Sequence, residues 1–147
     1  MSSPKIAKAL SACDASYIAG LVDGEGTVTL TRKHRGEFRQ LAVSVSSTEA
    51  PLLDFILERT GVGKITNKRR YQAHHLPSYT YSVHNRQALA LLQSIEPYLK
   101  SYKSRRAKLA LQEYLCVTPR NGKYSADLLA AKRDFEKRFL EIRPHSS

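Results

Sequence analysis

Two acidic residues, Asp23 and Glu25, stand two positions apart at the end of an apolar run and are separated by glycine. The run 18–22 consists of small and aliphatic residues, which predicts a closely packed helix, and Gly24 and Gly26 predict its end. A helix C-terminus carries partial negative charge, so each acid placed there is disfavoured by about 0.3–1 kcal/mol. The arrangement therefore suggests a compensating cation, with a metal ion as the natural candidate. The alternative is a capped turn with two solvated carboxylates.

The charge balance of this 147-residue chain points to a polyanionic partner. Twenty-four Lys and Arg oppose thirteen Asp and Glu, for a formal net charge of +11. Such an excess favours nucleic acid first and an anionic membrane surface second. No segment is typical of a basic amphipathic membrane helix, and no apolar run approaches the roughly 18 residues needed to span a bilayer. We therefore expect a nucleic-acid partner and no membrane association.

The cysteines and the first residues bear on the compartment. Cys13 and Cys116 lie far apart, without zinc-type spacing or a disulfide framework, so we expect buried thiols in a reducing compartment. Lys5 and Lys8 interrupt the first ten residues, which do not resemble a signal peptide. The expected location is intracellular, in the cytoplasm of a prokaryote or in an organelle, and not secreted.

The two acids need a helix followed by a hairpin to position them. Asp14 is a suitable N-cap for a helix that runs through Val22. Alternating residues predict strands over 27–34 and 40–46, joined by a polar loop. A helix follows over 51–60, with Pro51 in its first turn, and Gly61-Val62-Gly63 ends it.

The later part of the chain repeats the order of hairpin and helix. A second hairpin is predicted over 64–70 and 79–84, with helices over 86–94, 105–116 and 126–139. The predicted class is α+β. We expect one domain over residues 1–147, made of an N-terminal arm (1–13), a core (14–117) and a C-terminal helical tail (118–147).

One face of both hairpins is rich in hydroxyl, amide and basic side chains. From residue 27 to 47 the one acid is Glu37, in the loop. A two-stranded ribbon fits the DNA major groove, where such side chains can bond base edges and phosphates. A solvated sheet face is the alternative, but it usually includes acids. The residues expected to contact DNA are Thr27, Thr29, Thr31, Lys33, Arg35, Arg39, Gln40, Ser44, Thr66, Lys68 and Arg70.

Residues 18–26, Ile-Ala-Gly-Leu-Val-Asp-Gly-Glu-Gly, resemble the motif of a single-motif LAGLIDADG homing endonuclease. Their context agrees in order: a hairpin, a helix ending at 61–63, a second hairpin, a short helix, Pro97-Tyr98-Leu99-Lys100 and a basic run over 103–107. The likeness covers about residues 14–115. It implies an αββαββα homing-endonuclease core whose antiparallel, saddle-shaped sheet lies over DNA, plus C-terminal helices.

The resemblance also implies a homodimer, because the chain holds one motif. Two parallel motif helices would bring both Glu25 carboxylates together, which requires bound cations. The implied metal ligands are Glu25 and the Gly24 carbonyl, and the implied ion is Mg²⁺, with Ca²⁺ or Mn²⁺ able to substitute in binding. No small-molecule cofactor is expected. The implied dimer interface comprises Ile18, Ala19, Gly20, Leu21 and Asp23.

Three catalytic residues carry over from the family pattern. Glu25 stands where the family usually has Asp. Ser47 aligns with a polar residue, commonly Gln, that ends the second strand and helps to order waters. Lys103 aligns with an active-site lysine if one residue is inserted here, and a cation there would stabilise charge developing on the phosphate. An ordinary phosphate-positioning lysine is the alternative for Lys103.

These features predict an intron-encoded or intein-type endonuclease that cuts both strands of a long, pseudo-palindromic DNA site by metal-dependent phosphodiester hydrolysis. The alternative is a non-cleaving nucleic-acid binder of the same fold, such as an intron RNA splicing cofactor (maturase). A basic structural protein ranks last, because it leaves the two acids unexplained.

Overall fold

The computed structural model describes residues 6–32, 34–36, 38–68 and 76–144. A helix followed by a hairpin occurs twice and a third helix closes the core: α1 Ala12–Glu25, β1 Gly26–Thr31, β2 Gln40–Ser47, α2 Ala50–Thr60, β3 Lys64–Lys68, β4 Ser78–His84 and α3 Asn85–Ile95. The predicted αββαββα order is confirmed. The remaining elements are η1 Glu96–Tyr98, α4 Lys103–Glu113, η2 Leu115–Val117 and α5 Ala126–Glu141. Within the described part of the chain, no helix is long and apolar enough to cross a membrane.

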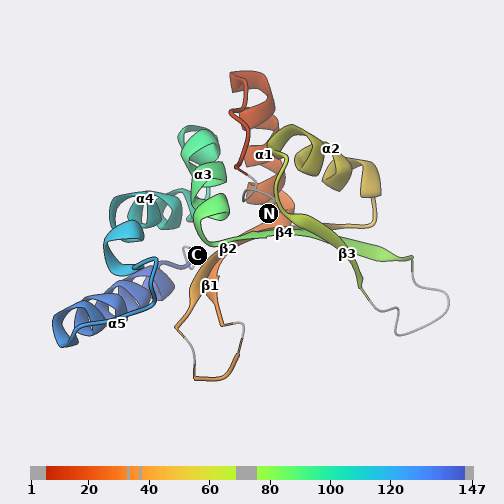
Figure 1. Ribbon diagram of the computed structural model, residues 1–147. Helices are drawn as coiled ribbons and strands as arrows, with labels where there is room; N and C mark the ends of the chain where they lie inside the picture. The colour runs from red at the N-terminus through yellow and green to blue at the C-terminus, as the bar shows by residue number, and fades with distance from the viewer. Residues whose placement is uncertain (1–5, 33, 37, 69–75, 145–147) are drawn as a thin grey trace.

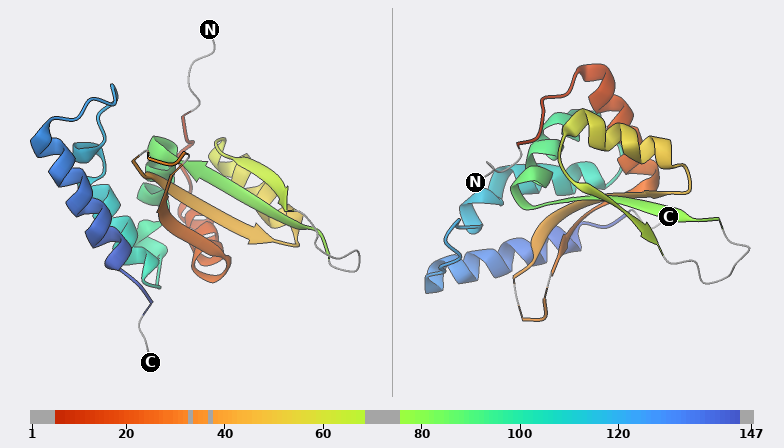
Figure 2. Two further views of the ribbon diagram at one scale, coloured as in Figure 1. Left: turned by 90° about the horizontal axis from the view of Figure 1, so that it is seen from below. Right: turned by 45° about the vertical axis from the view of Figure 1, so that its right-hand side comes forward.

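The strands form one antiparallel sheet in the order β1-β2-β4-β3. The two hairpins lie side by side through their inner strands, from Ala42 opposite His84 to Ser47 opposite Tyr79. Figure 1 shows α1, α2 and α3 on one side of the sheet, while the strands bend away from these helices towards the opposite side. The face turned away from α1 to α3 is therefore arched and open, with α5 beside the β1 edge (Figures 1 and 2).

The core lies between the sheet and the helices. Alternate strand residues such as Val28, Val43 and Val45 are buried on the helix side. They meet Ile18 and Val22 of α1, both completely buried. Full burial of each such side chain contributes about 1.5–3 kcal/mol to stability. The same alternation leaves the intervening polar residues on the open face.

Helix α1 passes directly into β1, and Gly26 makes this junction possible. The Gly26 N–H donates to the Val22 carbonyl. A Cβ at Gly26 would lie 2.8 Å from both the Ser44 carbonyl oxygen and the Val22 Cα. Only glycine allows so close a backbone approach. The junction therefore holds the end of the motif helix against the sheet.

Some predicted boundaries and burials differ from the structure. The N-cap of α1 is Ser11, whose Oγ accepts from the Asp14 N–H at 3.1 Å, so the prediction of Asp14 as N-cap is wrong by one turn. Serine and aspartate cap equally well, and local sequence alone does not rank them. The first strand ends at Thr31, before residue 34. Cys13 and Cys116 are exposed rather than buried.

Candidate functional site

The end of α1 presents Glu25 to solvent. Glu25 is the last residue of the helix and is exposed, as is Gly24 before it. Within the described residues, no group of three or more His, Cys, Asp or Glu could hold a metal ion. One chain thus offers one carboxylate and a neighbouring carbonyl. These hard oxygen donors fit Mg²⁺, which keeps several waters and needs few protein ligands.

Asp23 has a different task from Glu25. Its Oδ2 accepts from the Lys100 N–H at 2.8 Å, and its Oδ1 accepts from the Ser101 N–H at 3.2 Å and the Ser101 Oγ at 2.6 Å. Partial burial raises the pKa of Asp23, but these hydrogen bonds and the Lys103 charge outweigh it, so the pKa lies below its usual value. Asp23 therefore ties the end of α1 to the segment that precedes α4. This carboxylate is bound within the protomer, and its place in a dimer interface stays a prediction.

Lys103 caps the C-terminus of α1. Its Nζ donates to the Val22 carbonyl at 2.8 Å and to the Asp23 carbonyl at 2.9 Å, and the residue is 7% exposed. Burial lowers the pKa of Lys103, and Asp23 opposes that shift. A cation at this position satisfies carbonyls that a helix end leaves without partners and offsets the negative end of the dipole. Part of the positive charge that the two acids were expected to need is therefore supplied by Lys103 of the same chain.

Ser47 ends β2 at the turn into α2. Its Oγ accepts from the Glu49 N–H at 3.0 Å. Such a local bond from a serine hydroxyl is typical of turns. The structure thus assigns Ser47 a role in the turn, and its predicted ordering of waters stays a prediction.

The open face of the sheet gathers most of the predicted DNA contacts. Thr27 pairs with Ser44 and Thr31 with Gln40 across the first hairpin. Ser44 in turn lies opposite Ser82 of β4. Thr29 and Thr66 share this face by alternation. The described strands contain no acidic residue, so a continuous neutral-to-basic surface spans the sheet.

The remaining predicted DNA contacts divide into three groups. Arg35 is exposed in the connection between β1 and β2. Lys33 and Arg70 lie outside the described residues, and Lys68 is described only as a backbone partner of Ser78. Arg39 does not point freely to solvent, because its Nη1 lies 3.2 Å from the Glu136 Oε1 on α5. The prediction of Arg39 as a DNA contact therefore meets a competing partner within the chain.

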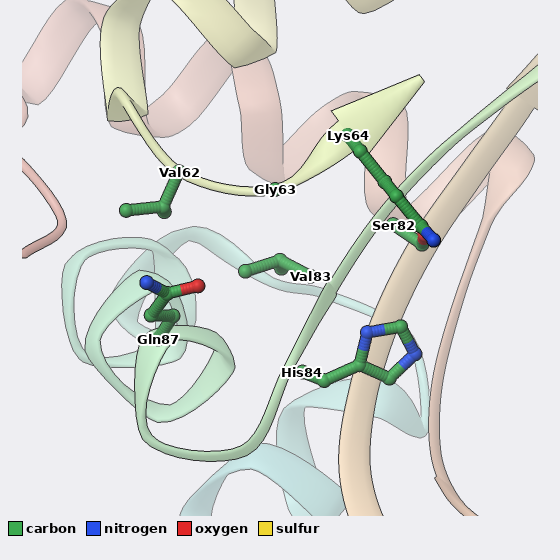
Figure 3. A pocket seen from close by; sticks show the side chains of 7 residues that line it. All are labelled: Val62, Gly63, Lys64, Ser82, Val83, His84 and Gln87. Atoms are coloured by element: carbon green, nitrogen blue, oxygen red, sulfur yellow. The ribbon is translucent and has the colours of Figure 1, made fainter. Parts of the chain in front are cut away.

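A hollow of about 340 Å³ opens where β4 extends past the start of β3. Figure 3 shows Lys64, Ser82 and His84 along one side of it, with Val62 and Gln87 opposite. Its lining combines the polar groups of Lys64, Ser82, His84 and Gln87 with the apolar side chains of Val62 and Val83. The sequence prediction missed Lys64 and Ser82, although their alternation with Ile65 and Val83 could have placed them on the polar face.

The predicted dimer interface divides in the structure. Ile18 and Ala19 are completely buried in the core of their own protomer. Gly20 and Gly24 are exposed, and a Cβ at either would meet nothing within 4 Å. Leu21 is half-buried. Ile18 and Ala19 thus lie on the helix face that points to the sheet, and the predicted dimer interface stays a prediction. A surface free for a second helix exists on the glycine face.

Comparison with known proteins agrees with this geometry. Residues 12–96 match the LAGLIDADG-like domain family. No curated protein matches the chain. Similar solved structures include the homing endonuclease I-CvuI in complex with its target in the presence of calcium, with TM-score 0.71 and 19% identity over 92% of this chain and 85% of that chain. The archaeal intron-encoded homing endonuclease I-Vdi141I complexed with DNA has TM-score 0.61 and 16% identity over 92% and 87%.

A third similar structure, the LAGLIDADG meganuclease I-AabMI bound to uncleaved DNA, has TM-score 0.60 and 18% identity over 83% of this chain and 43% of that chain. At such identities these structures show the fold alone. The mixed arrangement of helices and one antiparallel sheet is the fold of the LAGLIDADG homing endonucleases.

Proposed function

This chain belongs to the LAGLIDADG-like domain family. From that membership we propose that it is a site-specific DNA endonuclease of the kind that introns encode. It makes double-strand breaks by metal-dependent phosphodiester hydrolysis. One observation carries the proposal: the exposed Glu25 carboxylate ends α1 at the point where the acid-free open face begins with Gly26 and Thr27. A hydrolytic site and a DNA-reading surface are thus contiguous.

Double-stranded DNA is the proposed partner of the open face. The net charge of +11 supplies a sequence-independent attraction to phosphates. Threonine, serine and glutamine side chains on the strands provide donors and acceptors for base edges in the major groove. The similar homing endonucleases are complexes with DNA, which supports the same partner here.

The proposed active form is a homodimer. Among the described residues, one chain offers no group of three or more acidic, histidine or cysteine ligands, and Glu25 is the exposed acid at the end of α1. Packing of two α1 helices through Gly20 and Gly24 would bring two Glu25 carboxylates together. Like charges in such proximity favour a shared divalent cation. This geometry makes each site incomplete without the second copy.

The residues of this chain divide the catalytic work. Glu25 and the Gly24 carbonyl would hold Mg²⁺, which when bound supplies stabilisation of phosphate charge and an activated water. Lys103 and Asp23 hold the helix end that carries these ligands. The open face binds and orients the duplex, so that its phosphates lie over the two helix ends.

The decisive test is cleavage. Duplexes that bind the protein would be selected from a random library and then incubated with protein and Mg²⁺, with a chelator as control. We expect both strands to be cut with Mg²⁺ and neither to be cut with chelator. Specific binding without nicking or double-strand cleavage would contradict the endonuclease proposal.

The second candidate is a non-cleaving binder of the same fold, such as an intron RNA splicing cofactor. The burial of Lys103 on backbone carbonyls favours it, because that cation is then withheld from a phosphate. It predicts structured RNA bound in preference to duplex DNA and no cutting with Mg²⁺. The same cleavage assay, with a parallel RNA-binding measurement, separates the two.

A further inference from the structure

We propose that the C-terminal layer formed by α4, α5 and the segment before α5 positions the β1–β2 hairpin and thereby sets its base preference. Arg39 and Glu136 are the central positioning pair. This inference rests on the proposed DNA binding but not on cleavage. It concerns residues that touch other protein groups rather than the duplex.

The Arg39–Glu136 contact joins the turn end of the hairpin to α5. Arg39 directly precedes β2, and its Nη1 lies 3.2 Å from the Glu136 Oε1. Glu136 is buried, and its Oε2 has no hydrogen-bond partner among the described residues. Lys132, one turn earlier, is also buried and its charge acts on Glu136, but its Nζ donates to the Thr118 Oγ1 at 2.9 Å and not to the carboxylate. Arg39 is thus the cation that hydrogen-bonds this buried carboxylate.

Release of Arg39 to a DNA phosphate would leave Glu136 buried without that cation. Removing one partner of a buried ion pair is strongly unfavourable, since the remaining charge has lost its solvent as well as its partner. Arg39 therefore holds the hairpin in place and does not read DNA.

A second contact holds the neighbouring residue of the hairpin. The ring centroids of Phe38 and Tyr124 are 4.6 Å apart, within the range of packed aromatic pairs. Tyr124 belongs to the segment before α5, whose N-cap is Ser125. Successive hairpin residues, Phe38 and Arg39, thus contact the same C-terminal layer.

The layer also binds the backbone of both strands. Arg106 donates from Nη1 to the Val28 carbonyl and from Nε to the Ile142 carbonyl, each at 2.8 Å. The Tyr114 hydroxyl accepts from the Leu41 N–H at 3.2 Å. Strand β1 is an edge strand, so a bond to its backbone from outside the sheet fixes an edge that is otherwise unpaired. Figure 2 shows α5 alongside this hairpin.

These contacts act at the turn end of the hairpin and along the edge strand β1, which β2 separates from β4. A small rotation there moves Thr29 and Thr31 relative to base edges, and base recognition tolerates only about 0.5 Å of displacement. Among the described residues, the side-chain contacts of α5 and of the segment before it with a hairpin fall on Phe38 and Arg39 of the first one. The layer therefore governs base pairs that the β1–β2 hairpin reads and leaves those read by β3–β4 unchanged.

The test compares base-preference profiles. Duplexes carrying each single base-pair change in the selected site would be titrated with wild type, Glu136→Gln, Arg39→Ala and the double variant. Thr29→Ala and Thr66→Ala assign base pairs to each hairpin, and Lys137→Ala, exposed beside Glu136 on α5, is the matched control.

We expect Glu136→Gln to weaken discrimination by about five- to tenfold at base pairs read by the β1–β2 hairpin and by less than about twofold elsewhere. Arg39→Ala should give the same profile, and the double variant should add little, because both changes break one contact. The control should match wild type. Tyr124→Leu should produce the same pattern through the aromatic contact.

Three results would overturn the inference. One is unchanged discrimination in Glu136→Gln. Another is a uniform loss across all base pairs, which indicates general destabilisation. The last is a uniform loss with a reduced salt slope in Arg39→Ala alone, which indicates a phosphate contact. A wild type that binds selectively without cutting contradicts the endonuclease proposal while leaving this test intact.

Discussion

The two acidic side chains at the end of α1 have different surroundings, because the helix directs them to different sides. Residues two apart on a helix are rotated by about 200°, so their side chains leave opposite sides. Asp23 faces the segment before α4 and accepts hydrogen bonds from Lys100 and Ser101, whereas Glu25 is exposed. We therefore assign the proposed metal chemistry to Glu25, while Asp23 and Lys103 hold the helix end that carries it.

Replacing Glu25 with glutamine tests this division. The amide keeps the shape of the side chain but loses the charge that holds a divalent cation. We expect cleavage to fall by about 100-fold or more, beyond the ~10–100-fold that loss of an outer partner costs. DNA affinity measured with Ca²⁺ should stay within about threefold, since the open face is unaltered. Glu58→Gln removes the same charge from an exposed position of α2 and is the control. Undiminished cutting by Glu25→Gln would refute the assignment.

Replacing Lys103 with methionine tests its role at the helix end. The change leaves the Val22 and Asp23 carbonyls without a charged donor, so the free energy of unfolding should fall by about 1.5–3 kcal/mol. Urea unfolding would measure it. Lys108→Met, on the exposed side of the same helix, should cost little. A loss of cleavage with unchanged stability would instead make Lys103 a purely catalytic group.

At the scale of elements, α4 and α5 form a layer that is held by exposed and by buried contacts, and these differ in how much they stabilise it. Arg138 meets Glu113 through two hydrogen bonds, with Nη1 to Oε2 at 2.7 Å and Nη2 to Oε1 at 2.5 Å. Both side chains are substantially exposed, so solvent screens the pair. The buried contacts of Arg106 and Tyr114 therefore do more to hold the layer on the sheet.

The Glu113–Arg138 pair predicts a small, pH-dependent stability. The hydrogen bond from Arg138 holds the pKa of Glu113 below its ordinary value of 4.5. A carboxyl whose pKa is lowered by folding stabilises the fold above the unfolded pKa, and this contribution is lost as pH falls through the folded pKa. We expect Glu113→Gln to cost about 0.2–1 kcal/mol at pH 7 and nothing in strong acid. Urea unfolding at several pH values checks this, with Glu141→Gln as control. A difference that persists in acid would contradict it.

At the scale of the whole molecule, the active form depends on what covers the exposed face of α1. Gly20 and Gly24 leave that face without side chains, which lets a second helix approach closely. The buried residues of the same helix already serve the core. One helix thus packs on its own sheet, and its opposite side is the surface that the proposed homodimer would use.

Gly20→Arg tests the homodimer. Open space surrounds the added side chain, and a non-glycine residue favours the helix by up to about 1 kcal/mol, so the isolated chain should fold as well as wild type. Sedimentation should show a monomer, and cleavage should be lost with the melting temperature retained. Ala131→Arg adds the same side chain at an exposed position of α5 and should leave both the dimer and cleavage intact. A dimeric, active Gly20→Arg would place the interface elsewhere.

The sequence by itself determined the order of helices and hairpins, the polar face of the sheet and the acidic end of the motif helix. These follow from local periodicity, glycines and charge, all within a few residues of one another. It also indicated the family, because the motif occurs with its elements in order. Element ends such as Ser11 were less well predicted, since several nearby residues can cap a helix.

Only the tertiary structure decided what the long polar side chains do. Asp23 binds the Lys100 N–H 77 positions away, Lys103 binds the Asp23 carbonyl 80 positions away, and Arg39 binds Glu136 97 positions away. Local patterns report which face a residue occupies, whereas the partner of a charged group is whichever atom the fold brings within about 3 Å of it. For that reason a lysine expected at the phosphate proved to cap the motif helix, and an arginine expected on DNA proved to bind a glutamate of α5.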